Sequence, residues 1–463
     1  MQNRYYELRK KHERFIYHDF LISEGKISFH FSISGEPDIH FTPEWTFDLP
    51  LQGDIRLFAF NLGMAELVSY WKCACPPVVE IRCGILSARQ ISWWKKLYRN
   101  GLGEFFYRNG IEPGDDFMRI ERPRSSQPNS PQNSTFFWAD GIGSGGSPLE
   151  VTGNELPLPE KRELSGCLIP VGGGKDSIVT MELLKSHDSH GNNLCYIINP
   201  RRPVLETAYA AGFADDKIVK VNRTIDAALL RLNSLGYLNG HTPFSSVIAF
   251  SGLLFAYLAG KKHLVLSNES SANEANIAGT DINHQYSKSA VFEADFREYA
   301  QISFGQAPEY FSLLRPWSEW QITKKFTEHP RYLNVFQSCN IGSKTDTWCG
   351  KCAKCLYVYI MLAAFLSDDK LIPVFGANLL DSQELEPIFN GLVYENVDKP
   401  FECVGTRNEI NLALDGAQKR RNHPEALPFL LRKYAENPVP SVSLDKYFDK
   451  NNYVPEDFLR LLK

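Results

Sequence analysis

The run 168–177 contains the residue types that bind phosphate most readily, with three glycines followed by a lysine, an aspartate and a serine. Apolar residues precede the glycines, so the run predicts a strand, a tight turn and a helix that begins near Ser177. Backbone N–H groups of such a turn, together with the helix dipole, attract an anion. We therefore expect a phosphate site formed by Gly172, Gly173, Gly174, Lys175, Asp176 and Ser177.

The glycine turn differs from the common lysine-containing phosphate loop. That loop requires Ser or Thr directly after its lysine, whereas Lys175 is followed by Asp176. The Gly-Gly-Lys-Asp-Ser order of residues 173–177 instead resembles the Ser-Gly-Gly-x-Asp-Ser loop of the adenine nucleotide α-hydrolase (PP-loop) superfamily, with Gly172 in place of the first serine. The resemblance implies a HUP-like parallel-sheet fold and cleavage of ATP between its α and β phosphates. A glycine-rich turn without a ligand is the alternative.

A second group of residues has the spacing of metal ligands. The pattern is Cys-x9-Cys-x2-Cys-x2-Cys, formed by Cys339, Cys349, Cys352 and Cys355. Two-residue gaps let neighbouring thiolates converge on one ion, so the pattern predicts a closed, structural zinc site. An iron–sulfur cluster and four unrelated buried cysteines are the alternatives. The pattern also resembles the cysteine quartet of the deazaguanine nitrile synthases, which share the PP-loop fold.

Charge and hydropathy limit the partners of the chain. A formal net charge of -4 argues against a nucleic acid partner, because such partners need a basic surface. The longest apolar stretch, 247–260, is shorter than a helix that spans a bilayer, and the N-terminus lacks the pattern of a secretory signal. We therefore expect a cytoplasmic protein, with no membrane segment and with its ten cysteines reduced.

The first part of the chain combines strand and helix patterns. Alternating apolar residues at 27–33 and at 39–41, separated by the turn residues 34–37, predict a β-hairpin. Helical periodicity predicts helices at 57–71 and 88–98, with a strand at 78–83 between them. Residues 123–148 are rich in Pro, Ser, Asn and Gly, which is typical of a linker. We expect an N-terminal α+β domain at 1–122 and a flexible linker at 123–159.

From about residue 160, strands alternate with helices, which is typical of a parallel α/β domain. The predicted strands are 167–170, 194–199, 217–221, 263–267 and 310–314. Ligands of parallel sheets bind beyond the carboxyl ends of the strands, so Asn199, Asn268 and Glu269 should border the phosphate site. The stretch 247–260 predicts a buried helix, with Thr242 as its N-cap and Pro243 as its first residue. We expect the PP-loop domain at 160–370 and a mostly helical region at 371–463.

Further motifs make the resemblance more specific. They are Ser-Tyr-Trp-Lys at 69–72 with the prolines at 76–77, the polar runs 268–276 and 283–289, Trp-Cys-Gly at 348–350, and Lys-Pro-Phe-Glu-Cys-Val-Gly at 399–405. Together with the glycine turn, they resemble the UDP-N-acetylmuramoyl-L-alanyl-L-glutamate epimerase (MurL) family over roughly residues 50–410. The resemblance implies that ATP and Mg²⁺ are used to invert the terminal L-glutamate of the UDP-linked muramoyl dipeptide.

The implied reaction explains why an epimerase would bind a nucleotide. The α-amine of that glutamate lies in a peptide bond, so pyridoxal phosphate cannot form an imine with it. Adenylation of the α-carboxylate removes the negative charge that opposes loss of the α-proton. Reprotonation on the opposite face and hydrolysis would then give D-glutamate and AMP, with pyrophosphate released in the first step.

Several polar residues are candidates for roles in this chemistry. The resemblance places Lys175 on the phosphates, Asp176 on Mg²⁺ and Ser177 at the helix N-terminus, although Asp176 could also be an ordinary N-terminal carboxylate. An imidazole titrates near neutral pH, and a thiol beside a positive group has a lowered pKa. The proton-transfer candidates are His284, Tyr286, Lys288 and Cys403. We expect Cys403 to face a member of the 284–288 group across the α-carbon, the alternatives being a surface histidine and an ordinary buried thiol.

Two other classes of protein would use the same turn. One is an ATP-dependent amide-forming, nitrile-forming or thiolating synthase, which would consume a nitrogen or sulfur donor. The other is a nucleotide-binding protein without catalysis, which would bind ATP but form no AMP.

Overall fold

The computed structural model describes residues 2–122, 156–187, 190–277, 279–421 and 426–463. They form two compact units that interleave along the sequence. The first contains residues 1–164, 219–262 and 294–309, and the second contains residues 165–218, 263–293 and 310–463. The linker expected at 123–159 lies outside the described residues, except for 156–159, and the contiguous domain boundaries remain a prediction.

The first unit contains a mixed sheet with the strand order β9-β4-β2-β1-β5-β6, and β3 pairs with β2. β1 and β2 are antiparallel, whereas β5 is parallel to both β1 and β6. Alternate residues of β2 are buried, as the apolar alternation predicts, and the pairing of Phe31 with Phe41 confirms the hairpin. The strands are β1 (Arg14–Ser23), β2 (Lys26–Ile33), β3 (Ile39–Phe41), β4 (Glu44–Phe47), β5 (Val78–Ile81), β6 (Arg119–Glu121) and β9 (Ile218–Arg223).

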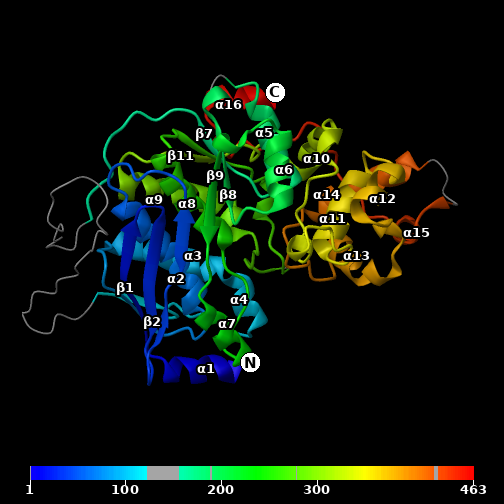
Figure 1. Cartoon of the computed structure of the whole chain (residues 1–463). Coiled ribbons are helices and arrows are strands. Elements are labelled where there is room, and N and C mark those ends of the chain that lie inside the picture. Colours follow the sequence, from blue (N-terminus) through cyan, green and yellow to red (C-terminus); the bar gives the residue numbers. More distant parts are fainter. Residues whose placement is uncertain (1, 123–155, 188–189, 278, 422–425) are drawn as a thin grey trace, which may run out of the picture. The chain divides into compact units, whose positions relative to one another are not determined.

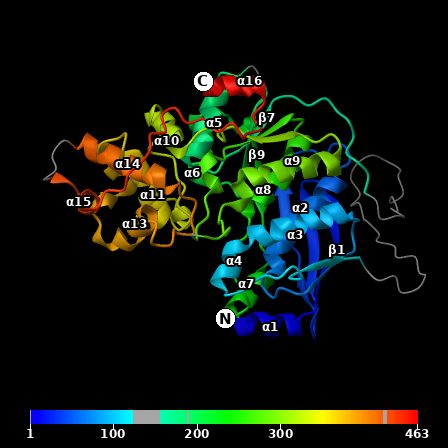
Figure 2. The same cartoon turned by 180° about the vertical axis from the view of Figure 1, so that it is seen from behind.

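Helix α2 packs against β1 and β2 on one side of the strands and also contacts α8 (Figures 1 and 2). It is buried almost throughout, so its polar side chains need partners. Glu66 has one in Arg223, whose Nη2 donates to Oε2 at 2.7 Å. Tyr70 and Trp71 are fully buried core residues. The helices of this unit are α1 (Gln2–Lys11), α2 (Arg56–Trp71), α3 (Ala88–Gly101), α4 (Gly103–Arg108), α7 (Ala227–Ser234), α8 (Phe244–Leu258) and most of α9 (Ala290–Phe304).

The strands of the second unit run in the order β11-β10-β7-β8. β7 lies between two parallel partners, with Leu168 opposite Leu264 on β10 and Leu194 on β8. The segments that follow β7 and β10 therefore leave the sheet at the same edge. The strands are β7 (Cys167–Pro170), β8 (Leu194–Ile198), β10 (His263–Leu266) and β11 (Glu309–Ser312).

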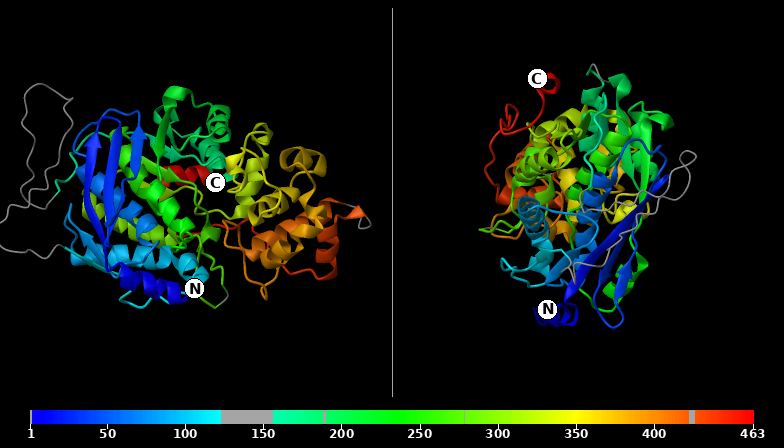
Figure 3. Two further views of the ribbon diagram at one scale, coloured as in Figure 1. Left: turned by 60° about the horizontal axis from the view of Figure 1, so that its bottom comes forward. Right: turned by 90° about the vertical axis from the view of Figure 1, so that its left-hand side faces the viewer.

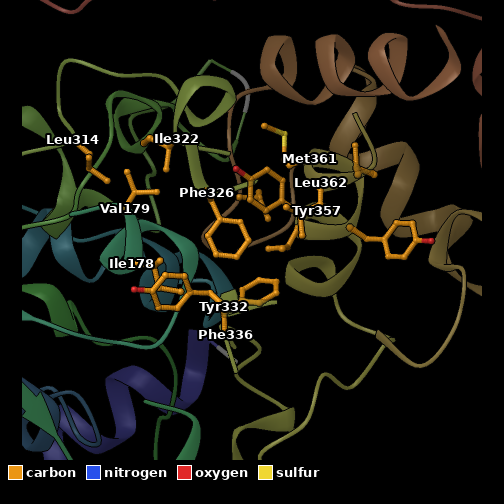
Figure 4. Packing of buried hydrophobic residues seen from close by; sticks show 14 of the residues in the cluster. Ile178, Val179, Leu314, Ile322, Phe326, Tyr332, Phe336, Tyr357, Met361 and Leu362 are labelled. Carbon is orange, nitrogen blue, oxygen red and sulfur yellow. The ribbon is translucent and has the colours of Figure 1, made fainter. Parts of the chain in front are cut away.

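The remaining helices surround a large apolar core in the second unit. Ile178 of α5, Phe326 of α10 and Tyr357 of α11 are three of its members (Figure 4). α11 contacts α10, α12, α13 and α14, so these helices gather into one group, drawn in yellow and orange in Figure 3. The helices are α5 (Lys175–Leu184), α6 (Arg202–Ala210), α10 (Glu319–Thr327), α11 (Ala353–Ala363), α12 (Asp368–Phe375), α13 (Glu386–Val393), α14 (Arg407–Arg420), α15 (Phe429–Glu436) and α16 (Glu456–Leu459).

The predicted α/β class and the helical C-terminal region are confirmed. β3 and β7 have the predicted bounds, and the other predicted strands and helices are shifted at one or both ends by one to three residues. One prediction is wrong: α8 begins at Phe244 with Pro243 as its N-cap and without a side-chain cap, so Thr242 does not cap it. The Thr242 hydroxyl instead accepts a hydrogen bond from the ammonium of Lys72. In the described part of the chain, no helix has the length and apolarity needed to cross a bilayer.

Candidate functional site

The glycine turn joins β7 to α5 and takes the conformation that its residues predict. Gly173 has a φ of 82°, which favours glycine, and a Cβ there would lie 3.2 Å from a methyl group of Val204. The Gln337 N–H donates to the Gly173 carbonyl at 2.8 Å and fixes the turn from the side. α5 begins at Lys175, two residues earlier than expected, with Gly174 as its N-cap.

Ser177 and Gly172 have different surroundings in this turn. The Ser177 hydroxyl donates to the Gly174 carbonyl at 2.9 Å and so supports the first turn of α5. A Cβ at Gly172 would meet no atom within 4 Å, so the position where PP-loop proteins carry serine is open. A ligand at the N-terminus of α5 therefore has room beside Gly172.

A lysine and three carboxylates lie at the start of α5. Lys175 is buried and forms ion pairs with Asp176 and with Glu319, the first residue of α10. Carboxylate oxygens of Asp176, Glu269 and Glu319 lie within 4.8 Å of one another. Glu269 follows β10 by three residues, as predicted from the shared edge of the sheet. This carboxylate cluster offers the oxygen ligands that Mg²⁺ prefers.

Burial and pairing act in opposite directions on these groups. Burial opposes ionisation of Lys175 and Asp176, but each holds the other charged, so the pKa of Lys175 is raised and that of Asp176 is lowered. Burial raises the pKa of Glu269 and brings that of Glu319 to about 7, although Lys288 and Lys175 respectively oppose these shifts. Three close carboxylates repel one another, so a cation stabilises the cluster.

A thiol and three cationic or titratable side chains form the second part of the site. Lys288 and His284 lie beside the Cys403 thiol, and the Lys354 ammonium donates to the Cys403 carbonyl. Burial opposes formation of the thiolate, but Lys288, His284 and Lys354 bring the pKa of Cys403 down to about 6. Lys288 and Lys354 also lower the pKa of Asp176. The Cys403 group and the carboxylate cluster are therefore electrostatically one site.

Hydrogen bonds hold the 268–288 segment against the 399–405 segment. Asn276 Oδ1 accepts from the His284 N–H at 2.8 Å, and its Nδ2 donates to the Pro400 carbonyl at 2.9 Å. Lys399 forms an ion pair with Glu274. These contacts explain how two motifs more than a hundred residues apart bring His284 and Lys288 to Cys403.

A buried ion pair also holds the 268–288 segment in place. Arg315 is fully buried and donates to Glu293 Oε2 at 3.1 Å and 3.0 Å, and also to the backbone carbonyls of Glu269 and Lys288. Glu293 Oε1 accepts from the Ser312 N–H at 2.8 Å. One guanidinium therefore fixes the backbone that carries Glu269 and the backbone that carries Lys288.

The four predicted cysteines converge at the N-terminus of α11. Their Sγ atoms lie within 4.8 Å of one another, at 3.7 Å for Cys339–Cys352 and Cys349–Cys355 and 3.6 Å for Cys352–Cys355. A disulfide requires about 2.05 Å. Tetrahedral zinc with Zn–S bonds of about 2.3 Å places sulfurs about 3.8 Å apart. The geometry therefore fits a tetrahedral metal site.

The remaining predicted residues occupy less central positions. Asn199 follows β8 with a φ of 50°, and the Asn268 amide donates to Ser312 Oγ at 3.1 Å. The Tyr286 ring packs against Phe292, with ring centroids 6.3 Å apart. That Cys403 faces a member of the 284–288 group across the substrate α-carbon stays a prediction.

Sequence reasoning missed three residues of this site. Glu319 follows a serine N-cap and belongs to no motif that was singled out. Lys354 lies between two of the clustered cysteines, and this position in the cysteine pattern (the knuckle, residues 349–355) is the signal that could have found it. Arg315, fully buried, gives no signal in a single sequence.

The chain matches two family models in succession, the MurL N-terminal domain at residues 7–313 and the MurL C-terminal domain at residues 335–441. The chain belongs to the MurL family. The Cys403 group combines residues from the two matched regions, because His284 and Lys288 lie in the first and Cys403 and Lys354 in the second.

Curated relatives in this family carry one name. A UDP-N-acetyl-alpha-D-muramoyl-L-alanyl-L-glutamate epimerase of Xanthomonas oryzae pv. oryzae is 33% identical over 355 residues, which cover 75% of this chain and 71% of the relative. Epimerases of the same name from Salinispora tropica and a Micromonospora species are 31% and 30% identical, over 86% and 85% of this chain and 82% and 83% of their own lengths.

Proposed function

We propose that this chain inverts the terminal L-glutamate of UDP-N-acetyl-α-D-muramoyl-L-alanyl-L-glutamate, and that ATP drives the inversion through an acyl-adenylate. The observation that carries the proposal is the likeness to the curated epimerases over most of the chain. The arrangement of the site supports it, since Lys288 and Lys354 lower the pKa both of Asp176 in the glycine turn and of the Cys403 thiol. A function in the cytoplasm, in synthesis of the cell-wall precursor, belongs to the same proposal.

The first step activates the substrate carboxylate. An oxygen of the α-carboxylate attacks the α-phosphorus of ATP, and the bond to the bridging oxygen breaks, so pyrophosphate leaves. Gly173, Gly174 and the N-terminus of α5 bind the phosphates, and Lys175 balances their charge. Asn199, Asn268 and Gly172 border the nucleotide at the carboxyl ends of the strands.

The carboxylate cluster fits a magnesium ion. A triphosphate beside Asp176, Glu269 and Glu319 would be repelled unless a cation lay between them, and carboxylate oxygens are ligands that Mg²⁺ accepts. When bound, the ion would neutralise charge on the phosphates. Of the three carboxylates, Asp176 lies closest to the glycine turn in sequence, and we propose it as the main ligand of the magnesium ion.

The second step moves the α-proton. The Cys403 thiolate takes the proton from the α-carbon of the adenylate, and the electron pair moves into the activated carbonyl. Lys288 holds the thiolate by charge, and His284 can pass the proton onward. Tyr286 is our candidate for reprotonation from the opposite face. Water then adds to the acyl carbon and AMP leaves with the oxygen that came from the carboxylate.

The four clustered cysteines hold a structural zinc ion in this account. All four positions of a tetrahedral ion would be filled by protein, so the ion would fix the start of α11 and would not touch the substrate. Lys354 lies in the last two-residue gap of the cluster, so the metal site also fixes the lysine that donates to the Cys403 carbonyl.

Chiral analysis of glutamate tests the proposed function. The UDP-linked muramoyl dipeptide is incubated with the protein, ATP and Mg²⁺, and the peptide is hydrolysed before the glutamate is separated by chirality. We expect D-glutamate together with AMP and pyrophosphate, and no requirement for ammonia or a sulfur donor. AMP formation that depends on such a donor would instead identify a synthase, and binding of ATP without AMP would identify a non-catalytic protein.

A further inference from the structure

Three histidines of the first unit lie together on one face of its sheet. They come from three neighbouring strands, His18 on β1, His30 on β2 and His40 on β3. One ring nitrogen of each lies within 4.8 Å of one from each of the other two, and His30 Nε2 lies 3.0 Å from His40 Nδ1. These residues form a group separate from the site described above, which lies in the second unit.

The backbone explains how the three rings reach the same face. On β2, Phe29 and Phe31 are buried whereas His30 between them points to the opposite face, which is partly exposed. The pairing of β1 with β2 is irregular between Tyr17 and Asp19, so His18 is the extra residue of a bulge. Bulges reorient a side chain, and here the His18 ring stacks on His30 with centroids 4.4 Å apart.

We propose that His18, His30 and His40 bind a zinc-class divalent transition metal ion. Neutral imidazoles are ligands for Zn²⁺, Ni²⁺ and Cu²⁺. Two nitrogens on tetrahedral zinc, with Zn–N bonds of about 2.0–2.1 Å, lie about 3.3 Å apart. The His30–His40 separation of 3.0 Å is close to that value. Three protein ligands leave a fourth position for water.

The carboxylate of Asp19 lies beside the His30 ring and can orient it. Asp19 Oδ2 lies 3.4 Å from His30 Nδ1, so it can hold a proton on that nitrogen and leave Nε2 free to bind a metal. The Ser32 hydroxyl lies 2.8 Å from His18 Nε2 and restrains that ring.

Arg82 is the positive group that opposes a cation here. Its Nη1 lies 3.3 Å from His18 Nδ1, and its Nε donates to Glu80 Oε1 at 2.6 Å, which offsets part of its charge. An ion at the three histidines would displace the contact with His18. Removing the arginine charge should therefore strengthen metal binding.

Metal titration of the full chain tests the inference. Zinc content after dialysis against buffered Zn²⁺ is measured for the wild type, His30→Gln, Arg82→Gln and His190→Gln. The last variant is the control, because His190 is exposed and belongs to the second unit. We expect His30→Gln to hold one zinc fewer than the wild type and the control. Arg82→Gln should bind that ion on the order of tenfold more tightly.

A Co²⁺ spectrum distinguishes this ion from one at the cysteine cluster. Co²⁺ on imidazoles gives visible d–d bands without thiolate charge transfer, whereas Co²⁺ on four thiolates gives both. We expect His30→Gln to lose the imidazole share of the d–d absorbance and to keep the full charge-transfer band. Far-ultraviolet circular dichroism checks that the variant is folded. Equal zinc content in wild type and His30→Gln would overturn the proposal, and unchanged affinity in Arg82→Gln would overturn the placement of the ion beside His18.

Discussion

The ammonium of Lys288 lies beside the thiol of Cys403 and, of the surrounding charges, lowers the pKa of that thiol most. The two residues come from segments more than a hundred positions apart. Asn276 joins these segments, because its amide donates to the Pro400 carbonyl and its oxygen accepts from the His284 N–H. This contact converts an ordinary cysteine into a base that is ionised at neutral pH. The proton-transfer step of the proposed epimerase depends on it.

Replacement of Cys403 should separate adenylation from inversion. Cys403→Ala removes the base but leaves the glycine turn and the carboxylate cluster intact. We expect solvent deuterium uptake at the α-carbon to fall by about 10²–10⁴-fold, the range for a general base. Pyrophosphate release should fall far less, and Cys403→Ser should not restore uptake because a hydroxyl has a much higher pKa. Undiminished uptake in Cys403→Ala would remove this thiol from the mechanism.

Alkylation should reveal the pH at which Cys403 ionises. Burial raises the pKa of the thiol, but Lys288 and His284 lower it to about 6, so its reaction with iodoacetamide should rise as the pH increases through about 6. In Lys288→Met the cation is lost, the folded-state pKa rises and the curve moves to higher pH. Mass spectrometry of the peptide that contains residue 403 measures the rate. Coincident curves for the two proteins would contradict the Lys288 contact.

Loss of charge in the carboxylate cluster should act on the earlier step. Asp176→Asn or Glu319→Gln weakens the proposed Mg²⁺ site, so we expect pyrophosphate release to slow by at least about tenfold and to require more Mg²⁺. Glu384→Gln changes an exposed carboxylate of the same unit and serves as the matched control. Normal Mg²⁺ dependence in both cluster variants would show that the carboxylates do not hold the ion.

The local chemistry of the site could be read from the sequence, but its assembly could not. The glycine turn and the cysteine knuckle depend on short spacings, so the positions of Gly173 and of the four sulfurs follow from neighbouring residues. Glu319 and Lys354 join the site only because α10 packs against α5 and α11 packs against α10. The placement of His284 beside Cys403 likewise depends on the hydrogen bonds of Asn276, whose role no periodicity indicates.

The residue pattern of each strand decides whether the sequence reveals it. β7 and β8 are short apolar runs bounded by turn residues, and their bounds were predicted to within one residue. β1 was missed although it pairs with β2 over its length, because it contains His18 and Asp19 at a bulge that interrupts the alternation. The interleaving of the two units also has no signature in composition, since it depends on which segments contact one another.

Removal of the knuckle metal should destabilise the chain. Cys355→Ser leaves three ligands for the ion, and structural zinc contributes on the order of 10 kcal/mol in zinc-dependent peptides. We expect the free energy of unfolding, measured by urea denaturation, to fall by several kcal/mol. Metal analysis should show that the bound zinc is lost. Lys351→Ala alters an exposed residue within the same knuckle and should change neither quantity. Full stability in Cys355→Ser would contradict a structural metal.

The buried Arg315–Glu293 pair should be more costly to break than to replace. Glu293→Leu leaves the guanidinium without its carboxylate, and we expect about 3–5 kcal/mol of destabilisation. The double variant Arg315→Met, Glu293→Leu removes both charges and should regain part of that loss in stability while remaining inactive, because Glu269 and Lys288 lose their backbone anchor. A double variant as unstable as the sum of the single variants would contradict the pairing.

Oxygen transfer from substrate to nucleotide tests acyl adenylation most directly. The UDP-linked muramoyl dipeptide is labelled with ¹⁸O in the α-carboxylate of its terminal glutamate and incubated with the protein, ATP and Mg²⁺. We expect AMP that carries one ¹⁸O atom for each turnover, released with pyrophosphate and accompanied by D-glutamate. Inversion with unlabelled AMP, or with ADP and orthophosphate, would contradict it.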